Sequence, residues 1–296
     1  MACSILGFGP EHEHERAHMS RILAALRADR AGATGFAIVA FLLMFALIGP
    51  LMTRHAPDAI ALADRLQAPG WQHWMGTDEL GRDLFSRIAH GARPSLLAAI
   101  VIVAATIFIG TLIGGLAGII GGWAETIVMR IVDVMLAVPP LVLTMALAAA
   151  LGPSLINALI ALLVVRLPFF VRLARGQTIG LMTRGYVEAA MLAGAGRLYL
   201  LRHHVAPNLA GIMLIQGLSD IAGVILAAAA LGFIGLGAQP PSPEWGALVA
   251  TGRSFALDAW WYGVFPGAAL LLSAIGFNLL GDWARDLLDP RTGDAA

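Results

Sequence analysis

The stretch YVEAAMLAGAGRLYLLRHHVAPN (Tyr186–Asn208) is polar and bears arginine, yet it lies between two long apolar runs. A membrane-embedded chain keeps such a sharply defined soluble element when something outside the bilayer must bind it. As a helix from Tyr186 to Arg202, the stretch would carry an apolar stripe, with charged side chains on its other faces. The stripe would consist of Leu192, Leu198, Tyr199 and Leu201.

Two glycines predict that this segment is not one continuous helix. Gly194 and Gly196 each cost about 1 kcal/mol relative to alanine inside a helix. They indicate a break between two short helices, or a surface that the backbone of a partner approaches closely. Glu188 falls in the first turn, where a carboxylate complements the helix dipole. Pro207 is expected to begin the next span, where its missing N–H does no harm.

The composition is that of a membrane protein with several spans. Of 296 residues, 58% are hydrophobic and 13% are charged, and the mean hydropathy is +0.79. A soluble domain carries about 25% charge. The formal net charge of zero argues against nucleic-acid binding. The single cysteine, Cys3, excludes an internal disulfide framework.

The basic residues are all arginine, and this excludes several kinds of chemistry. A P-loop needs a lysine at the β- and γ-phosphates, so the chain is not itself a Walker-type ATPase. Schiff-base lysine chemistry is excluded for the same reason. No HExxH motif and no intramembrane pair of catalytic carboxylates is present, so we expect no enzyme activity and no cofactor in this chain.

Six apolar runs are long enough to cross a bilayer, which requires roughly 20 residues per helix. The predicted fold is therefore an all-α polytopic membrane protein with both termini on one side. The predicted spans are Gly35–Met52, Ser95–Ile120, Ile131–Leu151, Ser154–Leu173, Leu209–Leu236 and Trp261–Leu280.

Arginine distribution predicts the orientation of these spans. The segments on the side of the N-terminus hold more arginines than the opposite loops, which places both termini in the cytoplasm. The expected organisation is a cytoplasmic tail over 1–34, a transmembrane domain over 35–291 with a cytoplasmic segment at 186–207, and a short tail over 292–296. His12, His14 and His18 are interpreted as polar residues of a solvated tail rather than as a metal site.

The polar segment resembles a known element when its spacing is considered. Glu188-Ala189-Ala190, then Gly194, then Pro207 is similar to the EAA loop, the coupling element of ABC importer permeases. Other stretches resemble the dipeptide and oligopeptide permeases of the DppC/OppC type. These are HWMGTDELGRDLFSRIAHGARPSL (His73–Leu96), MRIVDVMLAVPPLVL (Met129–Leu143), ARGQ (Ala174–Gln177), LGFIGLGAQPPSPEWG (Leu231–Gly246), FPG (Phe265–Gly267) and NLLGDWARDLLDPR (Asn278–Arg291).

The resemblance implies a type I ABC importer permease in a bacterial inner membrane. It implies a sister permease subunit, two cytoplasmic ATPase subunits that bind ATP and Mg²⁺, and an extracytoplasmic solute-binding protein. The solutes of this family are mainly di- and oligopeptides, with branches for nickel, opines and glutathione. The coupling residues that it implies are Glu188, Ala189, Ala190, Gly194 and Pro207.

Two ionisable residues lie inside predicted spans. Arg166 would cost about 2.5–3.5 kcal/mol at a helix centre. It either contacts a peptide carboxylate, or it extends toward the cytoplasmic end of the helix or pairs within the bundle. Asp220 either contacts a solute amine or makes polar contacts between helices. The family often has a carboxylate near Ala228, where this chain has AAAA, and an aromatic residue near Arg166, which leaves the solute class open. Arg166 and Asp220 are also the residues that an ion-coupled secondary transporter would need for its coupling.

Further expectations concern packing. Pro139-Pro140 is expected to kink the third span, and Arg130 is placed to pair with Asp133. Two further groups of residues are expected to have structural roles, one in helix packing and one at the membrane interface. Gly110, Gly114, Gly115 and Gly118 are expected to allow close helix packing, and Trp245, Trp260, Trp261 and Tyr262 to anchor the membrane interface. The charged group Asp78, Glu79, Arg82 and Asp83 is expected to form a solvated face.

Overall fold

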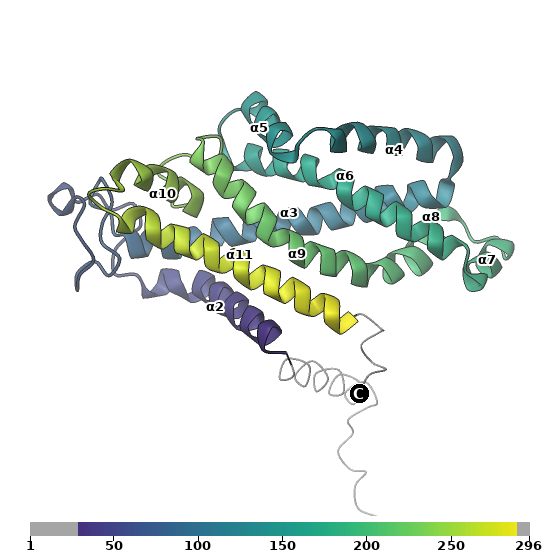
Figure 1. Ribbon diagram of the computed structural model, residues 1–296, viewed down its shortest axis with the longest axis horizontal. Helices are drawn as coiled ribbons and strands as arrows, with labels where there is room; N and C mark the ends of the chain where they lie inside the picture. The colour runs from purple at the N-terminus through teal and green to yellow at the C-terminus, as the bar shows by residue number, and fades with distance from the viewer. Residues whose placement is uncertain (1–28, 289–296) are drawn as a thin grey trace, which may run out of the picture.

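The computed structural model describes residues 29–288, which form an elongated bundle of helices with no strand in that range (Figure 1). The long helices are α2 (Arg30–Met52), α3 (Leu84–Ile120), α4 (Gly122–Ala137), α5 (Pro140–Leu151), α6 (Leu155–Met182), α9 (Ala206–Phe233) and α11 (Trp261–Leu288). The short ones are α7 (Gly185–Leu192), α8 (Arg197–Leu200) and α10 (Trp245–Gly252). The loop between α2 and α3 lies with α10 at one end of the bundle, and α7 lies at the other.

Five helices are long and apolar enough to cross a membrane, and the bent pair α4 and α5 brings the number to six within the described residues. The predicted positions of the spans are confirmed, but several boundaries were wrong. Helix α3 begins at Leu84 rather than Ser95, and α6 continues to Met182 rather than ending at Leu173. Both extensions contain arginines, which made these turns resemble loops in the sequence.

The third span is bent by 95° between α4 and α5. Val138, which precedes the two prolines, is extended at φ −90° and ψ 134°, as the steric demand of a following proline requires. Pro140 then occupies the first turn of α5, where its missing N–H removes no helical hydrogen bond. The predicted kink at Pro139-Pro140 is therefore present as a break of the helix.

Glycines allow α3 and α6 to pack closely, as predicted. A Cβ added to Gly114 would lie 2.2 Å from the carbonyl oxygen of Val171, and one added to Gly110 would lie 2.6 Å from the Cβ of Phe170. A Cβ at Gly118 would meet the side chain of Thr178 at 2.8 Å. Backbone contacts of this kind hold helices together where lipid offers no hydrophobic driving force.

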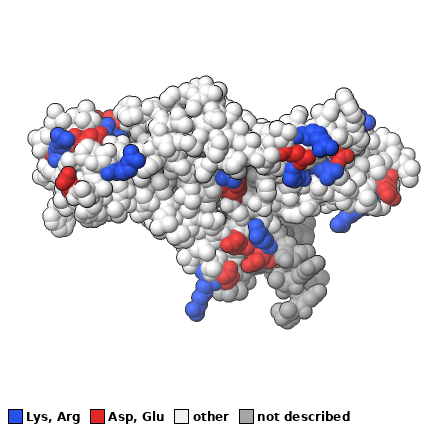
Figure 2. All heavy atoms as spheres, turned by 45° about the horizontal axis from the view of Figure 1, so that its top comes forward, with Lys and Arg blue, Asp and Glu red and all other residues white. Residues whose placement is uncertain are grey.

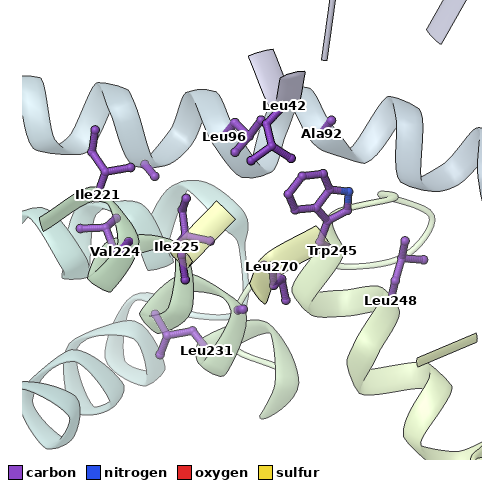
Figure 3. Packing of buried hydrophobic residues seen from close by; sticks show 14 of the residues in the cluster. Leu42, Ala92, Leu96, Ile221, Val224, Ile225, Leu231, Trp245, Leu248 and Leu270 are labelled. Carbon is purple, nitrogen blue, oxygen red and sulfur yellow. The ribbon is translucent and has the colours of Figure 1, made fainter. Parts of the chain in front are cut away.

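The core near α10 is built around Trp245, which is fully buried. Its indole N–H donates to the carbonyl oxygen of Ile88 at 2.9 Å, and the ring lies close to Leu42 and Ala92 (Figure 3). The expectation that the aromatic cluster anchors the interface is wrong for three of its four members. Trp245, Trp261 and Tyr262 are buried, and only Trp260 is exposed.

The charged group before α3 is buried rather than solvated, which corrects the expectation from the sequence. Asp78 and Arg82 are 0% and 5% exposed, and Arg82 Nε donates to Asp78 Oδ2 at 2.6 Å. Glu79 accepts a hydrogen bond from the hydroxyl of Tyr262 in α11. Asp83 caps α3 by accepting from the amide of Ser86 at 2.8 Å. These pairs satisfy charges that an unpaired burial would make costly.

Candidate functional site

The segment between α6 and α9 is fixed to the bundle by four buried side chains, those of Val187, Leu200, Leu201 and Val205. Val187 of α7 is fully buried, and Leu201 and Val205 pack in a cluster that includes Phe170 and Leu209. The expected apolar stripe is therefore only partly correct, because Leu201 faces inward and not toward solvent. These buried side chains anchor the segment to the bundle, while most of its other side chains are exposed.

Helix α7 ends in a compact glycine turn. Gly194 has a positive φ of 86°, and its amide donates to the carbonyl oxygen of Met191. The amide of Ala195 donates to the carbonyl oxygen of Ala190. These two bonds are those of a Schellman motif, in which a left-handed residue satisfies the last carbonyls of a helix. The predicted break at the glycines is confirmed, and it turns the chain from α7 into α8.

The outer surface of this segment is apolar and exposed. Leu192 is 90% exposed, Leu198 69% and Tyr199 51%. Glu188 and Ala189 are also exposed, whereas Ala190 is half-buried. We call this surface, formed by residues 186–199, the α7–α8 knob. At the end of a helical bundle, an apolar projection of this kind is suited to insertion into a groove of another protein.

Aromatic contacts fasten the two short helices to the helix that follows. The ring of Tyr199 stacks on His203 with centroids 4.3 Å apart, and Tyr186 of α7 lies 5.8 Å from His204. Residues 201–205 form a π turn that joins α8 to α9 without a break. Pro207 is exposed in the first turn of α9, as predicted, and the wider π turn precedes it. A displacement of the knob would therefore be passed directly to α9.

A separate polar contact lies in the middle of the bundle. Arg166 of α6 and Asp220 of α9 form an ion pair at 2.8 Å between Nη1 and Oδ1. The side chain of Arg166 is 30% exposed and that of Asp220 13%, and Asp220 Oδ2 is buried without a hydrogen-bond partner. Of the roles considered for Arg166, pairing within the bundle is the one that the structure shows. The pair lies near the midpoints of α6 and α9, whereas the knob lies between the end of α6 and the start of α9.

Two further ion pairs join α4 to α6 nearer the knob. Arg172 pairs with Asp133, and Arg175 pairs with Glu125. The expected pairing of Arg130 with Asp133 is therefore wrong, because α4 packs beside α6 and Asp133 contacts that helix instead. Figure 2 shows one face of the molecule, where charged side chains gather in groups at both ends of the long axis and in smaller groups between them.

An apolar groove of about 550 Å³ runs between α3 and α9. Its walls include Val103, Ile107, Met213, Leu214 and Gly217, and Arg202 lies at the end of the groove near the knob. Sequence reasoning did not identify this groove, because its residues are ordinary apolar residues of two different spans. It leaves an apolar face of the bundle without a covering helix within the described residues.

One buried carboxylate was not singled out from the sequence. Glu244 caps α10 by accepting from the amides of Gly246 and Ala247, and it also accepts from the hydroxyl of Ser95 in α3. Burial raises the pKa of the Glu244 carboxyl, and the hydrogen bonds from these two amides and from Ser95 oppose that shift. The signal available in the sequence was that Glu244 is the third residue from the end of the LGFIGLGAQPPSPEWG stretch. His12, His14 and His18 lie outside the described residues.

Comparisons with known proteins agree over most of the chain. A family model described as "Binding-protein-dependent transport system inner membrane component" matches residues 110–294, and a model of the "N-terminal TM domain of oligopeptide transport permease C" matches residues 19–69. The probable D,D-dipeptide transport system permease protein DdpC of Escherichia coli K12 is 52% identical over 274 residues, which are 93% of this chain and 92% of that protein.

Two other relatives carry related names. The di/tripeptide transport system permease protein DppC of Pseudomonas aeruginosa is 43% identical over 276 residues, covering 91% of each chain. The dipeptide transport system permease protein DppC of Alkalihalophilus pseudofirmus is 40% identical over 266 residues, covering 90% of this chain and 88% of that protein.

Proposed function

This chain belongs to the inner membrane components of binding-protein-dependent transport systems, and we propose that it forms, with a sister permease, the translocation pathway of an ABC importer for small peptides. It is a multi-pass inner-membrane protein and a non-catalytic subunit. Its family implies ATPase and binding-protein partners. ATP and Mg²⁺ would be bound by two separate ATPase subunits, and the solute-binding protein would deliver the peptide from the other side.

The observation that carries this proposal is the exposed apolar α7–α8 knob on a buried base. Leu192 is 90% exposed while Val187, five residues earlier, is fully buried, so the knob is rigidly attached yet free to enter a groove. The EAA-type residues Glu188, Ala189, Ala190 and Gly194 all lie on the knob. Pro207 lies in the first turn of α9, the helix to which a movement of the knob would be transmitted. Closure of an ATPase dimer around the knob would then shift α6 and α9 as rigid bodies.

Site-directed crosslinking tests the coupling role. In a Cys3→Ser background, Leu192→Cys in the reconstituted complex should crosslink to an ATPase subunit with a short bifunctional reagent. Leu257→Cys is the matched control, because Leu257 is 100% exposed and lies in the chain between α10 and α11, and α10 lies at the end of the bundle opposite to α7 (Figure 1). Capture of an ATPase subunit from position 257 but not from 192 would overturn both the coupling role and the proposed cytoplasmic location of the knob.

The solute that we propose is a dipeptide, on the names of the relatives. The groove between α3 and α9 would face the sister permease, and the two chains would enclose the pathway. Arg166 and Asp220 supply opposite charges that match the carboxylate and the ammonium group of a zwitterionic peptide. In this proposal the peptide exchanges partners with the ion pair during passage, which the unpartnered Asp220 Oδ2 favours.

Transport assays with modified peptides test this pathway role. Proteoliposomes holding the complete complex should take up a free dipeptide and discriminate against its N-acetylated and C-amidated forms. Arg166→Gln should lose discrimination against the amide, and Asp220→Asn should lose it against the acetylated form. Unchanged discrimination in both variants would remove the pair from the pathway. A nickel, opine or glutathione permease of the same family would instead fail to take up any dipeptide.

The alternative of an ion-coupled secondary transporter makes a different prediction. Uptake by the complete complex should require ATP and should be insensitive to a proton or sodium gradient. The chain reconstituted alone should show no gradient-driven uptake. Gradient-driven uptake without the ATPase subunits would favour the secondary transporter, with Arg166 and Asp220 as its coupling groups.

A further inference from the structure

A cluster of two histidines and an aspartate lies far from the knob, the groove and the Arg166–Asp220 pair. His55 follows the end of α2, His73 lies in the loop between α2 and α3, and Asp83 caps α3. One nitrogen or oxygen ligand atom from each side chain lies within 4.8 Å of the others. His73 and Asp83 are 7% and 5% exposed, whereas His55 is exposed.

Asp83 fixes the orientation and the protonation of His73. Its Oδ2 atom accepts from the amide and the hydroxyl of Ser86 at 2.8 and 2.7 Å, and its Oδ1 atom lies 2.9 Å from His73 Nδ1. A carboxylate can only accept, so the proton of the neutral imidazole resides on Nδ1. The lone pair of His73 Nε2 is then available. Histidines that bind metal ions generally have this carboxylate partner on their other nitrogen.

His55 supplies the second imidazole. Its ring centroid lies 5.0 Å from that of His73, with 34° between the ring planes, so the two imidazoles are close neighbours whose planes are tilted relative to each other. An adjoining cavity of about 470 Å³ is lined by both histidines, by Asp83 and by Asp64. This space can hold the water molecules that would complete a four-coordinate ion.

Among the described residues that line this cavity, Arg54 is the one whose charge opposes a cation. It lines the same cavity, and its guanidinium lies over the ring of Trp74 at 5.3 Å from the centroid. The carboxylates of Asp83 and Asp64 offset this charge. Removal of the Arg54 charge should therefore raise the affinity for a cation, and removal of the Asp83 charge should lower it. A purely structural role of the cluster predicts no such opposite effects.

We propose that His55 and His73 bind a divalent transition-metal ion of the zinc class, with Asp83 orienting His73. Imidazole nitrogen is a preferred ligand of Zn²⁺, at 2.0–2.1 Å. The ion would join the end of α2 to the first turn of α3 and so close the loop between them. The site is independent of the transported solute and of the coupling role of the knob.

Zinc titration of the full chain in lipid nanodiscs tests the proposal. The chain is purified without a polyhistidine tag, treated with EDTA, and carries alanine at positions 12, 14 and 18 so that the N-terminal histidines do not contribute. Isothermal titration with Zn²⁺ should show one site per chain, and saturation should raise the melting temperature. His55→Ala should remove the site, and because His55 is exposed the variant should fold normally in the absence of zinc.

Three further variants decide the roles. Asp83→Asn keeps a side chain that caps α3 and should weaken zinc binding about 10- to 100-fold. Arg54→Gln should tighten binding, and His203→Ala, at the other end of the bundle, should leave it unchanged. Absence of a zinc site in the starting chain, or equal binding before and after His55→Ala, would overturn the proposal. Binding that survives Asp83→Asn unchanged would overturn the orienting role.

Discussion

The guanidinium of Arg166 and the carboxylate of Asp220 meet at 2.8 Å near the midpoints of α6 and α9. Gly223, one turn beyond Asp220, leaves room for this contact, because a Cβ there would lie 3.0 Å from Arg166 Nη2. Each of the two charges therefore offsets the cost of burying the other. Removing one would leave the other as an unpaired charge in the middle of the bundle.

The first prediction concerns this pair. Arg166→Leu should destabilise the chain by about 3 kcal/mol, the lower end expected for a broken buried pair, because the arginine is partly exposed. The double variant Arg166→Leu/Asp220→Leu should recover most of that loss, since no unpaired charge remains. Thermal unfolding in detergent measures both. If the double variant loses as much stability as Arg166→Leu and Asp220→Leu lose in sum, charge pairing is not what the contact contributes.

The second prediction concerns Gly194. A Cβ at this position meets nothing within 4 Å, so the cost of a substitution arises from the positive φ alone. Gly194→Ala should cost about 1 kcal/mol of local stability, and Gly194→Asn less, because asparagine tolerates this conformation. Gly194→Asp should leave membrane insertion intact but abolish solute-stimulated ATP hydrolysis in the reconstituted complex. Normal ATPase stimulation in that variant would contradict docking of the knob.

The third prediction concerns the α3–α6 contact. Gly114→Ala should destabilise the chain by about 1–3 kcal/mol, because its Cβ would lie 2.2 Å from the carbonyl oxygen of Val171 and the helices would have to separate. Gly176→Ala, on α6 itself, meets nothing within 4 Å and should be neutral or stabilising in the isolated chain. Equal effects of the two variants on the melting temperature would show that the close approach is unimportant.

The fourth prediction concerns pH. Because burial raises the pKa of the Glu244 carboxyl above its ordinary value of 4.5, the folded chain holds this proton more tightly than the unfolded chain. Its stabilising effect is complete below pH 4.5 and is lost as pH rises through the raised pKa. Glu244→Gln should flatten this decline, at a cost of about 1 kcal/mol from one lost acceptor. Melting temperatures measured across that pH interval test it; an unchanged slope in Glu244→Gln would contradict it.

The sequence was sufficient for the spans, the helix break at Gly194 and the small-residue packing of α3, because each depends on a local pattern. It failed where a charge is compensated from far away. Arg82 and Asp78 look solvated until the loop folds against Tyr262, some 180 residues later in the chain. Asp133 was assigned to Arg130, its neighbour, because the placement of α4 beside α6 is a tertiary fact.

The knob itself was predicted only in part for a similar reason. The spacing of Glu188 and Gly194 identified the segment, but which leucines face outward depends on the turn at Gly194. That turn sets the direction of α8 relative to α7, and in the resulting arrangement Leu200 and Leu201 are buried while Leu192 and Leu198 are exposed. Glu244 shows the converse case, in which a single carboxylate before a short helix gave no sign of its contact with Ser95 across the fold.

The π turn at residues 201–205 makes α8 and α9 one unbroken rod from Arg197 to Phe233, 37 residues in all. Such a rod is about 55 Å long at a rise of 1.5 Å per residue. A tilt of only about 5° pivoting near Leu198 would sweep its far tip through about 5 Å, a span comparable to the width of a peptide backbone. Such a movement would need no bending of the helix, only a rotation of the knob about a point near Leu198.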